Sequence, residues 1–147
     1  MEKSFSYRFE NILDIKEKLE NERKNQLGKA VQRLESAEKK LIQWIERKKQ
    51  AEDDWNNQAR DVQKVQYFQQ ATNSFEYLDR MIQQQKEEIA QREKEVTEAR
   101  KNLMNAKKDT KIFEKIKEKD YESYRIVEQR KESELIDQIV THKSSRK

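Results

Sequence analysis

The chain has 147 residues, of which 42% are charged and 33% are hydrophobic, and its formal net charge is +4. This apolar content is too low for an ordinary globular core, so two classes remain: a disordered chain, or long helices that bury one narrow apolar stripe. The apolar residues recur at helical spacing, which favours the helices.

Residues that commonly end helices are scarce along the chain. There is no proline and a single glycine, Gly28, whereas Lys, Glu, Gln, Arg and Ala are abundant. Cysteine is also absent, so the chain can form neither a disulfide nor a thiolate metal site, in agreement with a reducing compartment. We therefore expect an all-α protein with long helices and without a metal or other cofactor.

Basic and acidic residues are interspersed along the whole sequence. Residues 1–73 hold 15 basic and 13 acidic residues, and residues 74–147 hold 18 and 16, so each half carries a net charge of +2. A protein that binds DNA or RNA usually gathers its basic residues on one face. Mixed signs are typical of a solvated helix face with i,i+4 ion pairs, so we expect no nucleic-acid partner.

No segment of the chain has the composition of a targeting or membrane segment. The first residues, MEKSFSYRFENIL, lack the apolar core of a signal peptide, and no stretch approaches the roughly 20 apolar residues that a membrane span needs. We expect a cytoplasmic protein.

Two apolar stripes with heptad spacing dominate the pattern. Each advances by alternating steps of three and four residues, which is the a/d pattern of a coiled coil. The first stripe has eight apolar positions of nine, and the second has ten of twelve. The first comprises Leu27, Ala30, Leu34, Ala37, Leu41, Trp44, Lys48, Ala51 and Trp55. The second comprises Phe68, Ala71, Phe75, Leu78, Ile82, Gln85, Ile89, Arg92, Val96, Ala99, Leu103 and Ala106.

The two stripes are out of register, because continuing the first through Val62 and Val65 leads to Gln69 rather than Phe68. Between them lies NNQARDVQK, residues 56–64, whose asparagines and aspartate favour turns. We predict two long helices that form an antiparallel coiled-coil hairpin. One continuous helix that dimerises is the alternative.

We expect a single coiled-coil domain over residues 1–147. Its first arm would cover about 8–55, its turn about 56–64, its second arm about 65–140 and its polar tail 141–147. At the N-terminal end the series Phe9, Ile12, Lys16, Leu19, Arg23 and Leu27 contains one irregular step. Near the C-terminus, Phe113, Tyr124 and Leu135 recur every eleven residues, which predicts that both ends are underwound.

Catalysis has little support in the sequence. The one histidine, His142, lies in the polar segment THKSSRK, and no glycine-rich phosphate loop or nucleophile elbow is present. A pair of helices also offers no interior that would separate the pKa values of two carboxylates. We expect a protein that is not an enzyme.

Several aromatic residues are candidates for partner binding. Trp44 and Trp55 lie on the first apolar stripe, where large rings fit poorly between two helices. They either anchor the packing of the two helices or are partly exposed anchors for a partner. Tyr121 and Tyr124 could stack on bases, although helix packing is favoured. Tyr77 and Met81 widen the apolar face after the turn. They either pack against a short structure at the turn end of the hairpin or bind another protein.

Three segments together resemble the flagellar export protein FliJ family. They are FSYRFENILDIKEKLENE at residues 5–22, FEYLDRMIQQQKEEI at residues 75–89, and FEKIKEKDYESYRIVEQRKESELIDQI at residues 113–139. The first is similar to the family's aromatic and basic opening, and the last to its closing Phe-Glu-Lys segment. The likeness spans nearly the whole chain.

The resemblance implies a coiled-coil stalk similar to the central stalk of rotary ATPases. Such a stalk would bind and activate the hexameric export ATPase FliI and contact the export gate protein FlhA and export chaperones. It would be a monomer when free, and it would lie in the cytoplasm at the inner face of the cell membrane, held there by its partners.

The resemblance also assigns candidate contact residues. Those near the termini would face the ATPase ring, and those after the turn, with Trp44 opposite, would face the gate. The first group is Phe9, Ile12, Phe113, Tyr121 and Tyr124, and the second is Trp44, Leu78, Met81 and Gln85.

Three other functions stay open at this point. The equivalent stalk of a virulence type III secretion system would share the fold and the mechanism. A nucleic-acid-binding coiled coil and a structural filament protein are less favoured.

Overall fold

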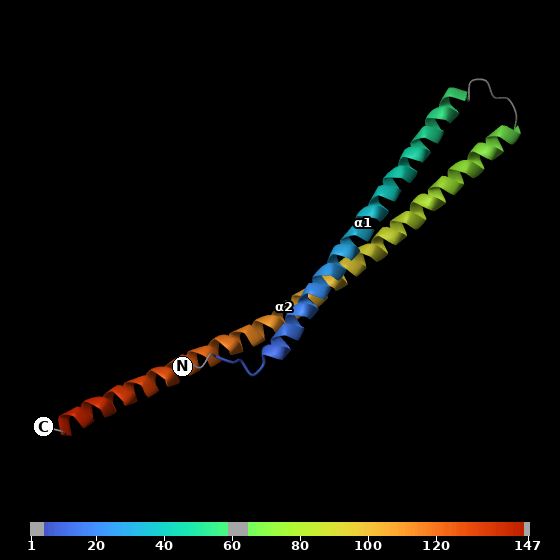
Figure 1. Cartoon of the computed structure of the whole chain (residues 1–147). Coiled ribbons are helices and arrows are strands. Elements are labelled where there is room, and N and C mark those ends of the chain that lie inside the picture. The colour runs from blue at the N-terminus through green and yellow to red at the C-terminus, as the bar shows by residue number, and fades with distance from the viewer. Residues whose placement is uncertain (1–4, 59–64, 146–147) are drawn as a thin grey trace. The chain divides into compact units, whose positions relative to one another are not determined.

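The computed structural model describes residues 5–58 and 65–145. Within these ranges the chain forms two helices, α1 (Glu10–Gln58, 49 residues) and α2 (Val65–Ser145, 81 residues), which pack against each other (Figure 1). No strand occurs among the described residues. The predicted all-α hairpin of two long helices is confirmed.

By its contacts the chain divides into two compact units. Unit 1 comprises residues 1–22 and 104–147, and unit 2 comprises residues 23–103. Whether the two form the single coiled-coil domain that the sequence predicts remains a prediction.

Burial in unit 2 follows the two predicted stripes. All nine positions of the first stripe are buried or half-buried, with Ala30 and Ala37 among the buried ones. Of the eleven positions of the second stripe that lie in unit 2, only Phe68 is exposed. The stripes therefore form the apolar seam between α1 and α2, and alanines on α1 let the helices approach closely.

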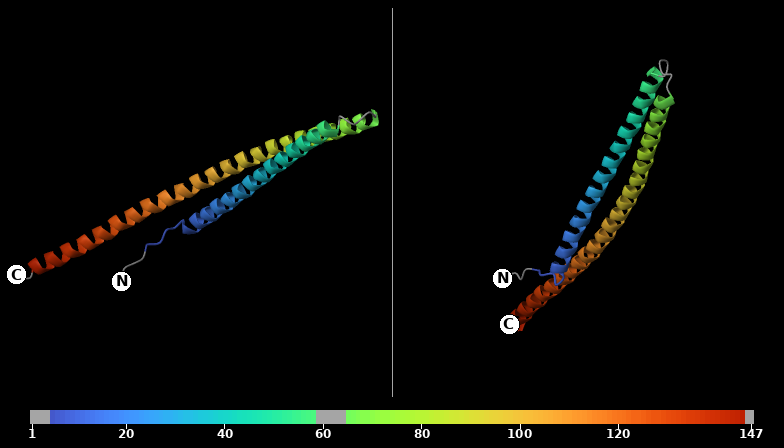
Figure 2. Two further views of the ribbon diagram at one scale, coloured as in Figure 1. Left: turned by 90° about the horizontal axis from the view of Figure 1, so that it is seen from above. Right: turned by 90° about the vertical axis from the view of Figure 1, so that its right-hand side faces the viewer.

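Contacts across unit 2 give the direction of the helices. Gln85 on α2 bonds to Ala37 on α1, Lys48 pairs with Asp79 at 2.6 Å, and the ring centroids of Trp55 and Phe68 lie 5.1 Å apart. Residue numbers rise along α1 as they fall along α2, so the helices are antiparallel. Both lie side by side in the two views of Figure 2.

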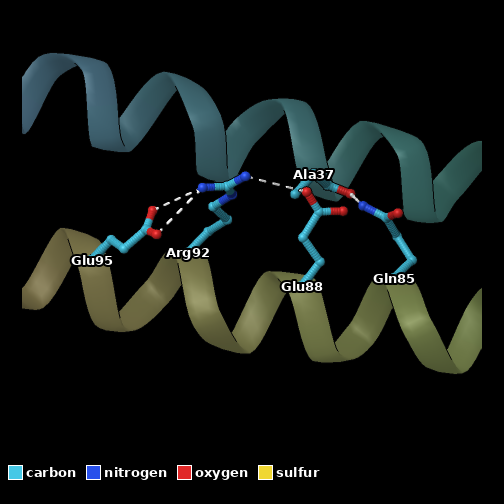
Figure 3. A network of polar contacts seen from close by, with 5 residues as sticks. All are labelled: Ala37, Gln85, Glu88, Arg92 and Glu95. Atoms are coloured by element: carbon cyan, nitrogen blue, oxygen red, sulfur yellow. Dashed lines mark hydrogen bonds and ion pairs between the residues drawn. The ribbon is translucent and has the colours of Figure 1, made fainter.

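The seam of unit 2 contains a polar network, shown in Figure 3. The buried Gln85 donates from Nε2 to the carbonyl oxygen of Ala37 at 2.9 Å. Two turns further along α2, the guanidinium of Arg92 pairs with Glu95 at 3.1 Å and with Glu88 at 3.5 Å. Its hydrogen bond to Glu95 raises the pKa of Arg92.

The first helix ends later than the sequence suggests. Asn56 and Asn57, which we assigned to the turn, belong to α1, which continues to Gln58; residues 59–64 of the predicted turn lie outside the described residues. Trp55 stacks on Tyr67 with 5.6 Å between ring centroids, and the Tyr67 hydroxyl bonds to Gln58. These tertiary contacts outweigh the weak helix propensity of asparagine.

In unit 1 the start of the seam is shifted by one residue from the expected series. Leu13 is 3% exposed, whereas Ile12, which we placed on the stripe, is 39% exposed. The series Phe9, Leu13, Lys16, Glu20, Arg23 advances in regular steps of four and three, and each member is at least half-buried. The irregular step expected at this end is therefore wrong, because Leu13 and not Ile12 lies in phase with the buried positions of the seam.

The seam of α2 in unit 1 also keeps heptad spacing. Thr110, Phe113, Lys117, Asp120 and Tyr124 follow in steps of three and four, and all are buried or half-buried. The eleven-residue interval between Phe113 and Tyr124 is the sum of three such steps, so the expected change of period is wrong before Tyr124. This continuation of the heptad is not apparent in the sequence, because Thr110, Lys117 and Asp120 are polar.

The last segment of α2 is helical to Ser145, so residues 141–145 of the predicted polar tail belong to the helix. His142 and Lys143 lie in the last turn, where positive or polar side chains suit the helix dipole, and Ser145 Oγ donates to the His142 carbonyl at 2.9 Å. Every described residue from 129 to 145 is exposed.

The buried Gln85 generates a prediction about register. Gln85→Leu replaces a polar seam residue with an apolar one. We therefore expect the free energy of unfolding, measured with urea, to stay equal or to rise by up to about 1 kcal/mol. Because the bond to Ala37 is lost, spin labels at the exposed Ile42 and Arg80 should show a broader distance distribution.

The matched control is Gln84→Leu, the same change at an exposed neighbour on α2. It should leave the distance distribution as narrow as in the parent chain. An equally narrow distribution in Gln85→Leu would contradict a role for Gln85 in register, and distant labels in dilute parent protein would contradict pairing within one chain.

Candidate partner-binding surfaces

Unit 1 contains a group of six aromatic residues that we call the terminal aromatic cluster. Three come from the segment before α1 and three from α2. Its members are Phe5, Tyr7, Phe9, Phe113, Tyr121 and Tyr124.

The rings of the terminal aromatic cluster meet mainly edge to face. Phe5 lies 5.3 Å from Tyr121 and 5.5 Å from Tyr124, and Phe9 lies 6.2 Å from Phe113, measured between ring centroids. The guanidinium of Arg8 lies 4.4 Å from the centroid of the Phe9 ring. Aromatic pairs in this geometry contribute more stabilisation than the burial of their apolar area alone. These ring contacts therefore hold the segment before α1 on α2.

Tyr7 anchors this segment. Its side chain is 5% exposed, and its hydroxyl donates to the carbonyl oxygen of Phe113 at 3.0 Å. Burial raises the pKa of the Tyr7 phenol, and the nearby Asp120 carboxylate raises it further. The neutral phenol that donates this bond is therefore the favoured form.

Charged residues surround the cluster. Lys117 on α2 pairs with Glu10, the first residue of α1, at 2.9 Å, and its hydrogen bond to Glu10 raises the pKa of the lysine. A shallow groove of about 390 Å³ lies beside the rings. It is lined by Phe5, Leu13, Glu17, Glu114, Lys117, Glu118 and Tyr121.

The structure brings together four of the five residues that we assigned to the ATPase side. Phe9, Phe113 and Tyr124 are half-buried within the cluster, and Tyr121 is 50% exposed at its edge. Ile12 is exposed and takes part in none of these ring contacts. Four of the predicted residues thus share one surface.

Two members of the cluster, Phe5 and Tyr7, were missing from the sequence prediction. The signal that could have found them is the alternation Phe5, Tyr7, Phe9, because side chains two residues apart point to the same side of an extended segment. Residues 5–7 lie outside the helices, and residues 8 and 9 form a turn before α1.

Unit 2 contains a second candidate surface, which we call the tryptophan face. It comprises Trp44, Arg47, Tyr77, Leu78 and Met81. The rings of Trp44 and Tyr77 lie 6.3 Å apart edge to face, and the Arg47 guanidinium lies 4.7 Å from the Trp44 ring. Lys40, Gln43, Trp44, Arg47, Met81 and Gln85 line a groove of about 340 Å³.

The residues predicted to face the gate are placed unequally. Trp44, Leu78 and Met81 are half-buried, which leaves part of each side chain accessible. Gln85 is 7% exposed and is bonded to Ala37. Its side chain therefore serves the seam, and contact with a partner would require that bond to break.

The remaining features that we weighed in the sequence are found at the surface or in the seam. His142 is exposed on α2, and the described residues contain no group of three potential metal ligands. Trp55 is a half-buried seam residue. Neither α1 nor α2 has, within the residues described, a stretch long and apolar enough to cross a membrane.

The raised pKa of Tyr7 predicts a loss of stability at alkaline pH. Since the folded pKa lies above that of the unfolded phenol, the neutral phenol contributes fully below about pH 10, and this contribution is lost as the pH rises through the folded pKa. We expect the difference in 295 nm absorbance between the parent chain and Tyr7→Phe to titrate above about pH 10.

The same difference measured in urea is the control, and it should titrate at the ordinary tyrosine value. An equal midpoint in the folded and unfolded chains would contradict the burial of this phenol.

Comparison with known proteins identifies the family of this chain. Neither a curated protein nor a solved structure matches the chain. One family, described as the flagellar FliJ protein, matches residues 5–147. This range includes the terminal aromatic cluster and the tryptophan face. The chain therefore belongs to the flagellar FliJ protein family.

Proposed function

We propose that this protein is a non-enzymatic stalk and coupling subunit of the flagellar type III export apparatus. The membership of the flagellar FliJ protein family, which extends over residues 5–147, carries this proposal. In this role the chain binds the hexameric export ATPase FliI and activates it by promoting or bracing its ring. It also contacts the gate protein FlhA and export chaperones, and it reaches the inner face of the cell membrane through these partners.

The terminal aromatic cluster is the surface that we assign to the ATPase. Its half-exposed Tyr121 and the neighbouring groove offer apolar contact, while Glu114, Lys117 and Glu118 offer charges of both signs. Aromatic residues with a polar edge commonly carry the binding energy of interfaces. A shallow surface of this kind can contact several subunits of a ring without a deep pocket.

The tryptophan face is the surface that we assign to the gate. Trp44 and Met81 line one groove, and Arg47 holds its guanidinium against the Trp44 ring. Tryptophan, tyrosine and arginine are the residues most often found to dominate binding energies at protein interfaces. Gln85 is left out of this surface because it is buried.

The flagellar family favours the flagellar apparatus over the equivalent virulence secretion system. The proposal is tested by measuring ATP hydrolysis by the purified export ATPase with and without this chain. We expect stimulation together with co-elution. The absence of both would remove the proposal.

A surface variant tests the role of the cluster. Tyr121→Ala removes an exposed ring from α2, so we expect stimulation of the ATPase to require at least about fivefold more protein, with helicity by circular dichroism unchanged. The control is Ile45→Ala, which removes a side chain of similar exposure on α1 of unit 2 (47%, compared with 50% for Tyr121). Equal loss in both variants would show that the cluster is not the ATPase contact.

A second pair of variants tests the tryptophan face. Met81→Ser should weaken binding to the purified gate protein about tenfold, because a half-buried side chain beside Trp44 is removed, while the helical signal is kept. Val96→Ser, at a buried seam position, should instead lower the free energy of unfolding by about 2–4 kcal/mol. A similar loss of stability in both variants would mean that Met81 belongs to the core.

A further inference from the structure

The last five turns of α2 carry an apolar face that no described residue of unit 1 covers. Every described residue from 129 to 145 is exposed, and in Figure 2 the red end of α2 has no described segment of its unit beside it. Four apolar side chains of this stretch are 49–59% exposed. They are Leu135, Ile136, Ile139 and Val140.

This face is not a continuation of the seam with α1. The seam on α2 in unit 1 runs through Lys117, Asp120 and Tyr124. Its next heptad positions after Val127 are Lys131, Glu134 and Gln138, all of which are polar. Ile136, Ile139 and Val140 therefore lie on a different side of the helix from the one that α1 covers, with Leu135 at the edge between the two sides, and this face needs a different occupant.

The exposed face has a heptad stripe of its own. Gln129, Glu132, Ile136, Ile139 and Lys143 advance by three, four, three and four residues. Leu135 and Val140 flank the two isoleucines and widen the apolar area. One acidic residue thus stands before the apolar pair and one basic residue after it.

This order of charges along the stripe is complementary between two copies of the chain when they lie antiparallel. If a second copy lies antiparallel with Ile136 opposite Ile139, then Glu132 of each copy lies opposite Lys143 of the other, because both pairs have the same sum of residue numbers (136 + 139 = 132 + 143 = 275). In an antiparallel coiled coil, a positions face d positions, which this register satisfies. A parallel pair would place Glu132 against Glu132 and Lys143 against Lys143.

We propose that the exposed stripe around Ile136 and Ile139 is a self-association surface, which joins two copies of this chain antiparallel through Glu132 and Lys143. The four apolar side chains offer much less than the about 800 Å² per partner of a standard interface. The dimer is therefore weak, forms at about 10 μM to 1 mM protein, and leaves a monomer in dilute solution. This inference goes beyond the proposed function and does not depend on it.

Cysteine pairing tests the arrangement directly, because the native chain has no cysteine. A mixture of Glu132→Cys and Lys143→Cys chains, carrying tags of different mass, should form the mixed disulfide at least about fivefold more than either variant forms with itself. In that mixed pair the second contact between Glu132 and Lys143 remains intact. Equal yields of mixed and self-linked species would overturn the antiparallel arrangement.

Charge exchange supplies a second test with a rescue. By sedimentation equilibrium, Glu132→Lys should weaken dimerisation about tenfold, because two like-charged pairs replace two opposite pairs. Adding Lys143→Glu in the same chain should restore the affinity to within about twofold of the parent. Glu134→Lys, an equal charge change off the stripe, should leave the affinity within about twofold of the parent.

A parent chain that stays monomeric up to about 1 mM would overturn the proposal. Loss of ATPase stimulation by Ile136→Ser with no change in dimerisation would also overturn it, because the stripe would then be occupied by the ATPase. Dimerisation that responds as expected, in a chain that does not stimulate the ATPase, would support this inference while contradicting the proposed function.

Discussion

The contact between the narrow apolar stripes of α1 and α2 is the interaction on which the rest of this protein depends. Long helices with 42% charged residues are marginal in isolation, and tertiary packing of one face supplies most of their stability. In unit 2 that packing is continuous from Ala30 to Trp55 on α1. The candidate partner surfaces lie where the seam is wider than a pair of helices can cover, or where one helix ends.

Both candidate surfaces follow this rule. At the tryptophan face, the large ring of Trp44 occupies a half-buried seam position, and the exposed Tyr77, which lies off the stripe, packs against it edge to face. At the terminal aromatic cluster, α1 has not yet begun, and the non-helical segment with Phe5 and Tyr7 takes its place on α2. Apolar side chains that are packed on one side and accessible on the other can bind a partner without unfolding the seam.

The end of α2 differs from both surfaces in the phase of its apolar residues. Up to Tyr124 the buried positions follow the heptad that faces α1, including polar members such as Thr110 and Lys117. Beyond Val127 that heptad becomes polar, and the isoleucines lie on another side of the helix. The change of phase separates the part of α2 that completes the chain's own fold from the part that is available for association.

The sequence by itself determined the helical class and nearly every seam position in unit 2, because heptad spacing without proline leaves the apolar residues on one stripe of each helix. It favoured antiparallel pairing within one chain over one continuous helix that dimerises, and the structure decided between them. Only the tertiary structure decided that Leu13 rather than Ile12 enters the seam, that Asn56 and Asn57 remain helical, and that Gln85 bonds to Ala37. It also placed Phe5 and Tyr7 on α2. These outcomes depend on contacts between residues far apart in the chain, and local spacing and propensity do not specify which distant residues make such contacts.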